Sequence, residues 1–311
     1  RGISIAASGV TIDLNGFELV GVPGSLDGIE ATTSNIINLH LQRGTVRDWG
    51  GDGIDLGNFA AAYSVLERLR VDGNASNGIR TGVNTTIAYA VSSNNTSSGI
   101  IAGNNNSLAA CSAGGNGTTG ITVGIGCTVT DCTAAANGDN GFSSGSGSIF
   151  SKCAANANDG SGFNVLTGCT VTASTAYNNN TYGINASTGS NVDGCTVRLN
   201  GTEGIRVSSQ CRVAGNICTS NGAAGEGAGI RVLGIDNHIE SNTCSNADIG
   251  IRVTGPDNII IKNTCARNTL NWDVVSGNIV LVINATPASV VTGDSGGVSP
   301  GSTNPNANYT Y

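Results

Sequence analysis

The chain has 311 residues, a formal net charge of -7 and few bulky side chains, since only 4% of its residues are aromatic. An acidic chain lacks the basic face that nucleic-acid binding requires, so we expect no nucleic acid among its partners. The sequence contains no apolar run of about 18 residues or more, so no membrane-spanning segment is expected. Forty-seven glycines and abundant Asn, Thr and Ser are typical of a chain that turns often.

The first segment, residues 1–27, is predicted to form the opening strands. An alternating stretch, residues 9–14, is followed by the tight turn Asn15-Gly16 and a second stretch, residues 17–19. The chain starts on Arg1 in a strand pattern and contains no Met. This start is typical of a product whose leader has been removed, so the expected location is secreted or on the cell surface.

Residues 28–285 repeat one phrase: a glycine, a large apolar residue, an outward-facing residue and a small or apolar residue. The glycine returns every 21 residues from Gly78 to Gly204, and eleven such glycines occur between Gly28 and Gly250. A period near 20 residues is too short for a helix pair and suits one turn of a solenoid. Apolar residues alternate with period two in three stretches of the repeat. The sequence therefore predicts an all-β, single-domain right-handed parallel β-helix of about eleven turns, with three short strands per turn and a 21-residue repeat.

Three segments depart from this repeat. Extra residues near positions 58–61 are expected to form a loop on one face of the solenoid, where binding sites often lie. A glycine-rich insertion, residues 222–227, is expected to be flexible. The last segment, residues 286–311, is rich in Gly, Ser, Pro and Asn and is predicted to be an extended tail.

An asparagine stands four residues before most repeat glycines. Turns stacked roughly 4.8 Å apart would place these side chains in a ladder. Asn tolerates the left-handed backbone of a tight turn, and its amide can bond the copies above and below. We interpret the column as structural; its members are Asn74, Asn95, Asn116, Asn137, Asn158, Asn179 and Asn200.

Four of the ten cysteines share one repeat position: Cys111, Cys132, Cys153 and Cys195, with Ser174 in the gap. Exchange of Cys with Ser indicates that size matters there more than bridging. Residues stacked in register also hold their Cβ atoms wider apart than the roughly 3.8 Å that a disulfide prefers. We favour a column of buried free thiols; disulfides, which are common in exported proteins, are the alternative.

Several stretches carry a family resemblance. The opening phrase VTIDLNGFEL, residues 10–19, and the late turns at residues 216–221 and 237–244 resemble the repeats of secreted bacterial right-handed parallel β-helix proteins in the pectate-lyase-like superfamily. The resemblance covers nearly the whole chain and implies the fold. It implies no single activity, because lyases, hydrolases, epimerases and adhesins share such repeats. No specific enzyme family is matched, since the Gly-His-Gly pattern of pectin hydrolases and the Trp-Ile-Asp-His phrase of pectate lyases do not occur.

The resemblance also implies carboxylates on adjacent turns of the outer face, where they hold calcium or act as acid and base. Asp27 and Glu30 on one turn and Asp52 and Asp55 on the next fit this pattern, with Arg80 one turn later. Stacked carboxylates repel one another unless a cation lies among them, and such oxygen-rich sites suit Ca²⁺. Three interpretations stay open: a solvated acidic corner neutralised by Arg80, a calcium site made by the four carboxylates, and a catalytic site at Asp52, Asp55 and Arg80.

A second charged column holds Arg206, Arg231 and Arg252 at one repeat position. Like charges on adjacent turns need counter-charges, and carboxylates nearby in the sequence can supply them: Glu203, Glu226 and Asp248. The alternative is a basic stripe that binds the carboxylates or sulfates of an acidic polysaccharide. The aromatic residues form no evident row for stacking on sugars, and His40 and His238 stand in no triad spacing.

Two functions of different classes fit these patterns. The ends of a β-helix expose unpaired backbone groups that can join another copy, and head-to-tail contacts that do not close produce filaments. The favoured hypothesis is an extracellular or cell-surface structural β-solenoid that assembles head to tail and contacts polysaccharide. The alternative is a Ca²⁺-dependent polysaccharide lyase or epimerase that acts on an acidic glycan at the four carboxylates, with Arg80 as base or charge stabiliser.

Overall fold

The computed structural model describes residues 1–57, 62–222, 225–284, 291–293 and 305–310. These residues form short β-strands joined by turns, and no helix occurs among them. The chain consists of two compact units, Arg1–Asp159 (unit 1) and Gly160–Tyr311 (unit 2). Together they contain about 12 turns with a ~21-residue repeat, which confirms the predicted right-handed parallel β-helix. The expected loop at residues 58–61 and most of the expected tail lie outside the described residues, as do residues 223–224 of the glycine-rich insertion.

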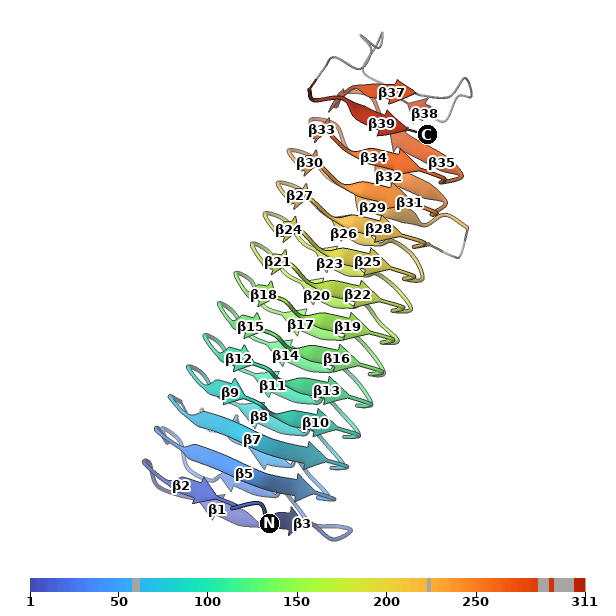
Figure 1. Ribbon diagram of the computed structural model, residues 1–311. Helices are drawn as coiled ribbons and strands as arrows, with labels where there is room; N and C mark the ends of the chain where they lie inside the picture. Colours follow the sequence, from blue (N-terminus) through green and yellow to red (C-terminus); the bar gives the residue numbers. More distant parts are fainter. Residues whose placement is uncertain (58–61, 223–224, 285–290, 294–304, 311) are drawn as a thin grey trace. The chain divides into compact units, whose positions relative to one another are not determined.

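The first sheet of unit 1 contains one strand from each turn (Figure 1). Neighbouring strands pair in parallel and one repeat apart, as Ile100 does with Ile121. This register places equivalent positions of the repeat side by side. The strands are β1 (Ile3–Ile5), β4 (Ile29–Ala31), β6 (Ile54–Asp55), β8 (Ile79–Thr81), β11 (Ile100–Ala102), β14 (Ile121–Val123) and β17 (Phe142–Ser144).

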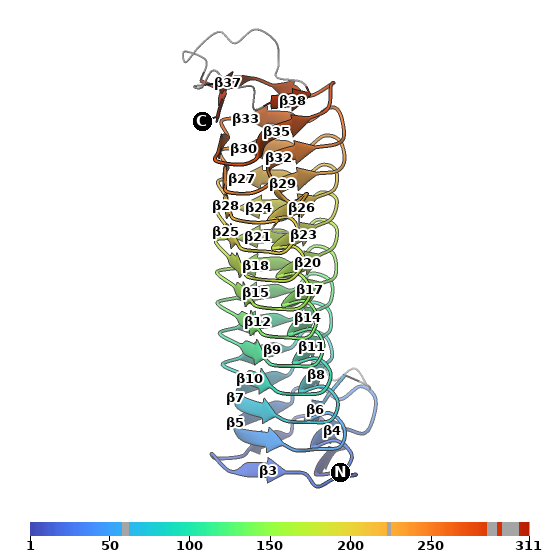
Figure 2. The same cartoon turned by 90° about the vertical axis from the view of Figure 1, so that its right-hand side faces the viewer.

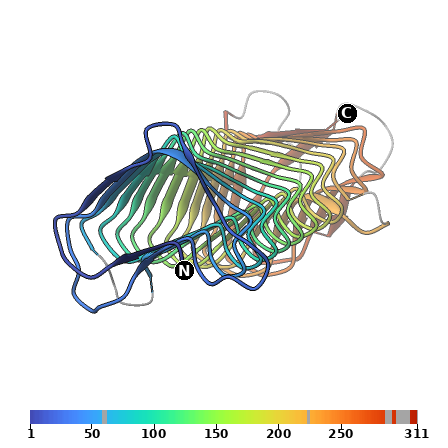
Figure 3. The ribbon, with the colours of Figure 1, turned by 90° about the horizontal axis from the view of Figure 1, so that it is seen from below.

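The second sheet of unit 1 lies on the other side of each turn from the first, as β5 and β7 do from β4 and β6 in Figure 2. Two of its strands have eight residues, and the later turns divide this length between two short strands. The later turns of unit 1, drawn in green, follow one outline (Figure 3). The strands are β2 (Thr11–Asp13), β3 (Glu18–Val20), β5 (His40–Arg47), β7 (Val65–Asp72), β9 (Thr86–Ala88), β10 (Val91–Ser93), β12 (Ser107–Ala109), β13 (Ser112–Gly114), β15 (Thr128–Thr130), β16 (Thr133–Ala135), β18 (Ile149–Ser151) and β19 (Ala154–Asn156).

Unit 2 repeats this arrangement. Its first sheet contains β20 (Phe163–Val165), β23 (Ile184–Ala186), β26 (Ile205–Val207), β29 (Ala228–Val232), β32 (Ile249–Val253), β35 (Leu270–Val274) and β38 (Val291–Gly293). Its second sheet contains β21 (Thr170–Thr172), β22 (Thr175–Tyr177), β24 (Asn191–Asp193), β25 (Thr196–Arg198), β27 (Arg212–Ala214), β28 (Ile217–Thr219), β30 (His238–Glu240), β31 (Thr243–Ser245), β33 (Ile259–Ile261), β34 (Thr264–Ala266), β36 (Ile279–Val280), β37 (Val282–Asn284) and β39 (Asn308–Thr310). Strands β38 and β39 belong to the segment that the sequence assigns to an extended tail, and they pair with β35 and β34. The boundaries at residues 27 and 285 stay predictions.

The core of each unit is a thin column of apolar side chains between the two sheets. Ile100 and Ile121 are fully buried, and so are Phe142 and Phe150, whose rings meet edge to face at 5.6 Å. Each buried side chain of this size contributes about 2 kcal/mol of hydrophobic stabilisation. Because the register is fixed by the repeat, every turn buries its apolar face against its neighbours.

The asparagines of the repeat form hydrogen-bonded ladders inside the corners. The Nδ2–H of Asn95 donates to Oδ1 of Asn116 at 3.0 Å, and the backbone N–H of Asn95 donates to the same oxygen at 3.1 Å. The same bonds link Asn137 to Asn158 in unit 1 and Asn179 to Asn200 in unit 2. Two further ladders of unit 2 were not anticipated from the sequence; they contain Asn216, Asn242, Asn263 and Asn308, and Asn237, Asn258 and Asn278.

All ten cysteines are buried free thiols in the structure. The Cys153 Sγ donates to the carbonyl of Val129 at 3.4 Å. Burial raises the pKa of the Cys153 thiol to about 11 and that of the Cys195 thiol to about 12, so both are protonated at neutral pH. Protonated, buried thiols are poor nucleophiles, and we therefore assign this column to packing.

Candidate functional site

Charged side chains gather on the outer face of the first sheet because the parallel register stacks one repeat position. In unit 1, Glu30 lies opposite Asp55 and Asp55 lies opposite Arg80. In unit 2, Arg206 lies opposite Arg231, which in turn lies opposite Arg252. The structure therefore brings together each of the two charged sets that the sequence singles out.

Arg80 is the centre of the acidic set in unit 1. Its Nε and one terminal nitrogen donate to the two oxygens of Asp55, each at 3.0 Å, and Asp52 lies 3.5 Å away. The side chains of Asp52 and Asp55 are only 7% and 5% exposed. Asp52 also accepts hydrogen bonds from the backbone and side chain of Asn77, at 2.9 and 3.0 Å. These two carboxylates are thus saturated by protein donors.

The other two carboxylates of the set have separate partners. Glu30 accepts from Arg1 at 2.8 Å and from the hydroxyl of Ser4 at 3.0 Å. Asp27 accepts the backbone N–H of Asp52 at 2.7 Å. Burial raises the pKa of Asp27 above its ordinary value, and the negative charge of Asp52 acts in the same direction, against the lowering effect of that hydrogen bond.

The arrangement differs from a calcium cage. Among the described residues, no group of three or more His, Cys, Asp or Glu side chains is placed to hold a metal ion. The physical reason is that the Arg80 guanidinium pairs with Asp52 and Asp55, so the positive charge that stacked carboxylates need is supplied by the chain itself. Calcium binding by this set, and a catalytic role for Asp52, Asp55 and Arg80, stay predictions.

The arginine column of unit 2 has three different kinds of partner. The guanidinium of Arg206 lies 5.0 Å from the ring centroid of Tyr182 and donates to its hydroxyl at 3.3 Å. Arg231 pairs with Glu203 at 2.7 Å. Arg252 pairs with Asp273 at 2.9 Å. Of the carboxylates named from the sequence as counter-charges, Glu203 pairs with an arginine of the column.

The other two carboxylates named from the sequence have different roles. Glu226 contributes its backbone carbonyl, which lies 3.5 Å from Arg252. Asp248 accepts the backbone N–H of Gly227 at 3.2 Å. The column is therefore neutralised less completely by nearby carboxylates than the sequence predicts.

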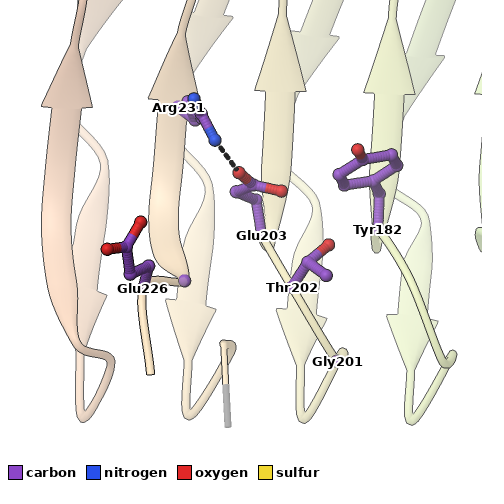
Figure 4. Close-up of a pocket in the computed structure, with 7 residues that line it drawn as sticks. Tyr182, Gly201, Thr202, Glu203, Glu226 and Arg231 are labelled. Carbon is purple, nitrogen blue, oxygen red and sulfur yellow. Dashed lines mark hydrogen bonds and ion pairs between the residues drawn. The ribbon is translucent and has the colours of Figure 1, made fainter. Parts of the chain in front are cut away.

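A pocket of about 270 Å³ lies beside this column. Figure 4 shows Tyr182, Thr202, Glu203 and Glu226 along it, with Arg231 bonded to Glu203. In the part of the chain that the structure describes, Nε of Arg231 and the hydroxyl of Thr202 are buried and have no hydrogen-bond partner. A buried polar group without a partner costs about 1–3 kcal/mol. The polar groups at this pocket are thus not saturated by the protein, in contrast to those around Arg80.

The pocket combines three chemical functions. Guanidinium groups bind carboxylates through paired, charge-assisted hydrogen bonds. A tyrosine hydroxyl and a glutamate can move protons as general acid and base. A half-buried aromatic ring such as that of Tyr182 can pack its accessible part against the apolar face of a sugar. Together these side chains suit a polymer of sugars that carry carboxylates.

Tyr182 and Thr202 were not identified from the sequence. Tyr182 stands 21 residues before Glu203, at the repeat position that Asp27 and Asp52 occupy in unit 1. This spacing is the sequence signal that could have identified Tyr182 as a member of the site. His40 and His238 lie in the second sheets, where His40 is 3.1 Å from Glu67 and His238 is 3.7 Å from Glu240.

Comparison with known proteins finds no family model and no curated protein that match the chain. The chain is similar in structure to the A-module of mannuronan C-5 epimerase AlgE6 of Azotobacter vinelandii, with a TM-score of 0.62, 16% identity, and coverage of 100% of this chain and 91% of that chain. It is also similar to the periplasmic alginate epimerase AlgG, with a TM-score of 0.55, 12% identity, and coverage of 99% and 84%. At these identities the likeness establishes the parallel β-helix fold alone.

A third structure has the same fold. It is a mannuronic acid specific polysaccharide family 6 lyase from human gut microbiota, with a TM-score of 0.53, 12% identity, and coverage of 91% of this chain and 80% of that chain. Among the described residues, no helix is long and apolar enough to cross a membrane.

Proposed function

We propose that the chain is a polysaccharide lyase or C-5 epimerase that acts on a polymer of uronate sugars, with its active site at the Tyr182 pocket of unit 2. The observation that carries this proposal is the convergence of Tyr182, Glu226 and the ion pair of Arg231 with Glu203 on one pocket, beside Arg206. The three similar structures bear the names of enzymes that act on polysaccharides, which supports this alternative over the structural role favoured from the sequence.

Both reactions begin with removal of the proton on C5, next to the sugar carboxylate. Arg206 and Arg231 would pair with that carboxylate and stabilise the charge that moves onto it when the proton leaves. The exposed carboxylate of Glu226 would take the proton. Glu203 would position Arg231 through their ion pair at 2.7 Å.

The fate of the intermediate decides the reaction. If the Tyr182 hydroxyl gives a proton to the opposite face of C5, the product is the epimer. If it gives the proton to the glycosidic oxygen on C4 as the C4–O bond breaks, the polysaccharide is cleaved and a double bond forms between C4 and C5. Atoms and charge balance in both cases, since each consumes the tyrosine proton and leaves a proton on Glu226.

The proposal places the protein outside the cytoplasm, where such polymers occur. One similar structure is described as periplasmic, which supports this location. Head-to-tail assembly into filaments and a structural role stay predictions of the sequence.

Product analysis in D₂O tests both reactions. The protein would be incubated with polymannuronate and with polygalacturonate, deuterium at C5 would be followed by NMR, and unsaturated ends by ultraviolet absorbance. With one polymer we expect deuterium at C5 if the intermediate is reprotonated there, or unsaturated ends if the bond between C4 and its oxygen breaks. Tyr182→Phe or Glu226→Gln should lower the rate of that product about hundredfold or more.

The matched control is Tyr177→Phe, because Tyr177 is a partly exposed tyrosine of unit 2 that does not line the pocket. Its rate should equal that of the unaltered chain. Absence of both deuterium at C5 and unsaturated ends with both polymers, or a Tyr182→Phe variant of full activity, would contradict the proposal.

A further inference from the structure

A second cluster of arginine and tyrosine side chains lies in unit 1, on the outer face of the second sheet. An open hollow of about 500 Å³ there is lined by Arg43, Arg68, Arg70, Tyr89 and Val91. No carboxylate among the described residues lines it, although the chain as a whole is acidic. This basic hollow, formed on β5, β7, β9 and β10 and the corners beside them, is separate from the pocket of the proposed function, which belongs to unit 2.

The register of the strands builds this hollow from two columns. Gln42 lies opposite Glu67, and Glu67 lies opposite Ala88, so the residues that follow them, Arg43, Arg68 and Tyr89, occupy one corner on successive turns. All three have left-handed backbone, with φ of 57°, 54° and 54°. In the next column, Arg70 lies opposite Thr45 on one side and Val91 on the other.

These side chains differ in the partners that they have within the protein. Arg43 donates to Asp13 and Arg70 lies 3.6 Å from Asp72. The guanidinium of Arg68 makes no ion pair or hydrogen bond with the described residues. The Arg70 side chain is 58% exposed, and Tyr89 is 60% exposed. The hollow therefore presents an exposed aromatic ring beside one guanidinium group, that of Arg68, with no partner among the described residues.

The charge of the hollow and its exposed ring indicate the ligand class. Arg68 and Arg70 lie two residues apart on β7, so their Cα atoms are roughly 6 to 7 Å apart. A uronate polymer carries one carboxylate per sugar, so its carboxylates can meet Arg68 and Arg70 through charge-assisted hydrogen bonds. A sugar ring can pack on Tyr89 and Val91. We propose that this basic hollow is a second binding site for an acidic polysaccharide, which holds the polymer without acting on it.

Binding of short uronate chains tests this site. Isothermal titration would use oligogalacturonate and oligomannuronate, with a neutral maltooligosaccharide as control. All measurements would be made on the full chain carrying Glu226→Gln, so that the ligand is not turned over. We expect Arg68→Asn with Arg70→Ser to weaken binding of the charged ligand about tenfold, and Tyr89→Asn to weaken it about threefold. Higher salt should weaken binding by the unaltered site.

Lys152→Asn is the matched control. Lys152 has the same left-handed corner conformation, with φ of 54°, but lies outside the hollow. Asn tolerates this conformation, so the substitutions at the corner remove the side chain without straining the backbone. Lys152→Asn should leave the affinity unchanged.

The inference is overturned if the arginine double variant binds as tightly as its parent, if Lys152→Asn weakens binding as much, or if the neutral sugar binds equally well. If Tyr89→Asn fails to fold by circular dichroism, the arginine variants decide. Binding without deuterium at C5 and without unsaturated ends would support this site and contradict the proposed activity. Formation of either product, with no effect of the arginine variants on binding, would support the activity and overturn this site.

Discussion

Glu30, Asp55 and Arg80 of unit 1 occupy the same repeat position as the arginine column of unit 2, yet the two regions have different surfaces. In unit 1 the column contains both signs of charge, and Arg80 bonds both oxygens of Asp55 at 3.0 Å within it. In unit 2 three arginines follow one another, and Arg206 and Arg231 find their partners outside the column, while Arg252 pairs with Asp273 at its end. The first arrangement closes on itself, while the second borders a pocket of about 270 Å³.

The difference depends on which charges the repeat stacks at one position. A parallel register stacks every outer position on its copy one turn away. Opposite charges at that position neutralise each other. Like charges cannot do so: Arg206 packs on Tyr182 and Arg231 pairs with Glu203, and Nε of Arg231 at the pocket has no hydrogen-bond partner among the described residues.

The closed set should matter more for stability than the open one. Asp55→Ala would leave Arg80 without its two hydrogen bonds and the Gly57 N–H without its acceptor at 3.0 Å. Because the Arg80 side chain is 30% exposed, we expect a loss of about 2 to 3 kcal/mol in the free energy of unfolding, less than a fully buried pair would show. Unfolding in guanidinium chloride, followed by circular dichroism, measures it.

Asp273→Ala is the counterpart in unit 2. Asp273 also stands next to an arginine in the outer column, but its side chain is 32% exposed. Asp273→Ala should lower the free energy of unfolding by about 1 kcal/mol or less. Equal losses of unfolding free energy in Asp55→Ala and Asp273→Ala would show that the two ion pairs contribute equally to stability, against this expectation.

The effect of calcium on stability tests whether Arg80 neutralises the acidic set of unit 1. Since Arg80 supplies the positive charge in unit 1, neither added calcium nor a chelator should change the melting temperature of the unaltered chain. Arg80→Ser would leave Asp52 and Asp55 without that charge, and calcium should then stabilise the variant by about 1 to 2 kcal/mol. Thermal melting with calcium and with chelator measures both. If calcium stabilised the unaltered chain as strongly, the calcium site predicted from the sequence would be supported instead.

The fold could be predicted because it depends on spacing alone. Glycines 21 residues apart, from Gly78 to Gly204, fix the number of residues per turn. Alternation of apolar residues fixes which side chains point inward, and the core follows from these two facts. The same logic places Asn95 on Asn116, because equal repeat positions must stack.

The site could be predicted only in part, because spacing does not state which partner a side chain chooses. It places Arg206 and Arg231 in one column, but not the ring of Tyr182 under Arg206. Glu203 and Glu226 both lie near the column in sequence, yet only Glu203 pairs with Arg231 through its carboxylate. Rotamers and loop paths decide these contacts, and neither is periodic.

The smallest expected effect concerns pH and Asp27. Burial raises the pKa of Asp27 above 3.8, so the folded chain holds this proton more tightly than the unfolded chain does. The contribution of Asp27 is therefore favourable below the unfolded pKa and is lost as pH rises through the folded pKa. Asp27→Asn keeps an acceptor for the Asp52 N–H, and should stabilise the chain slightly at neutral pH and not at all in acid.

Asp13 provides the opposite case in the same unit. The hydrogen bond from Arg43 lowers the pKa of Asp13, so its contribution is present above the unfolded pKa and is lost as pH falls through the folded pKa. Asp13→Asn should therefore destabilise at neutral pH. Melting temperatures from acid to neutral pH should change in opposite directions for the two variants. If both variants destabilised the protein at neutral pH, the Asp27 carboxylate would be paired with a cation in solution. The conclusion that Arg80 alone neutralises the acidic set would then be wrong.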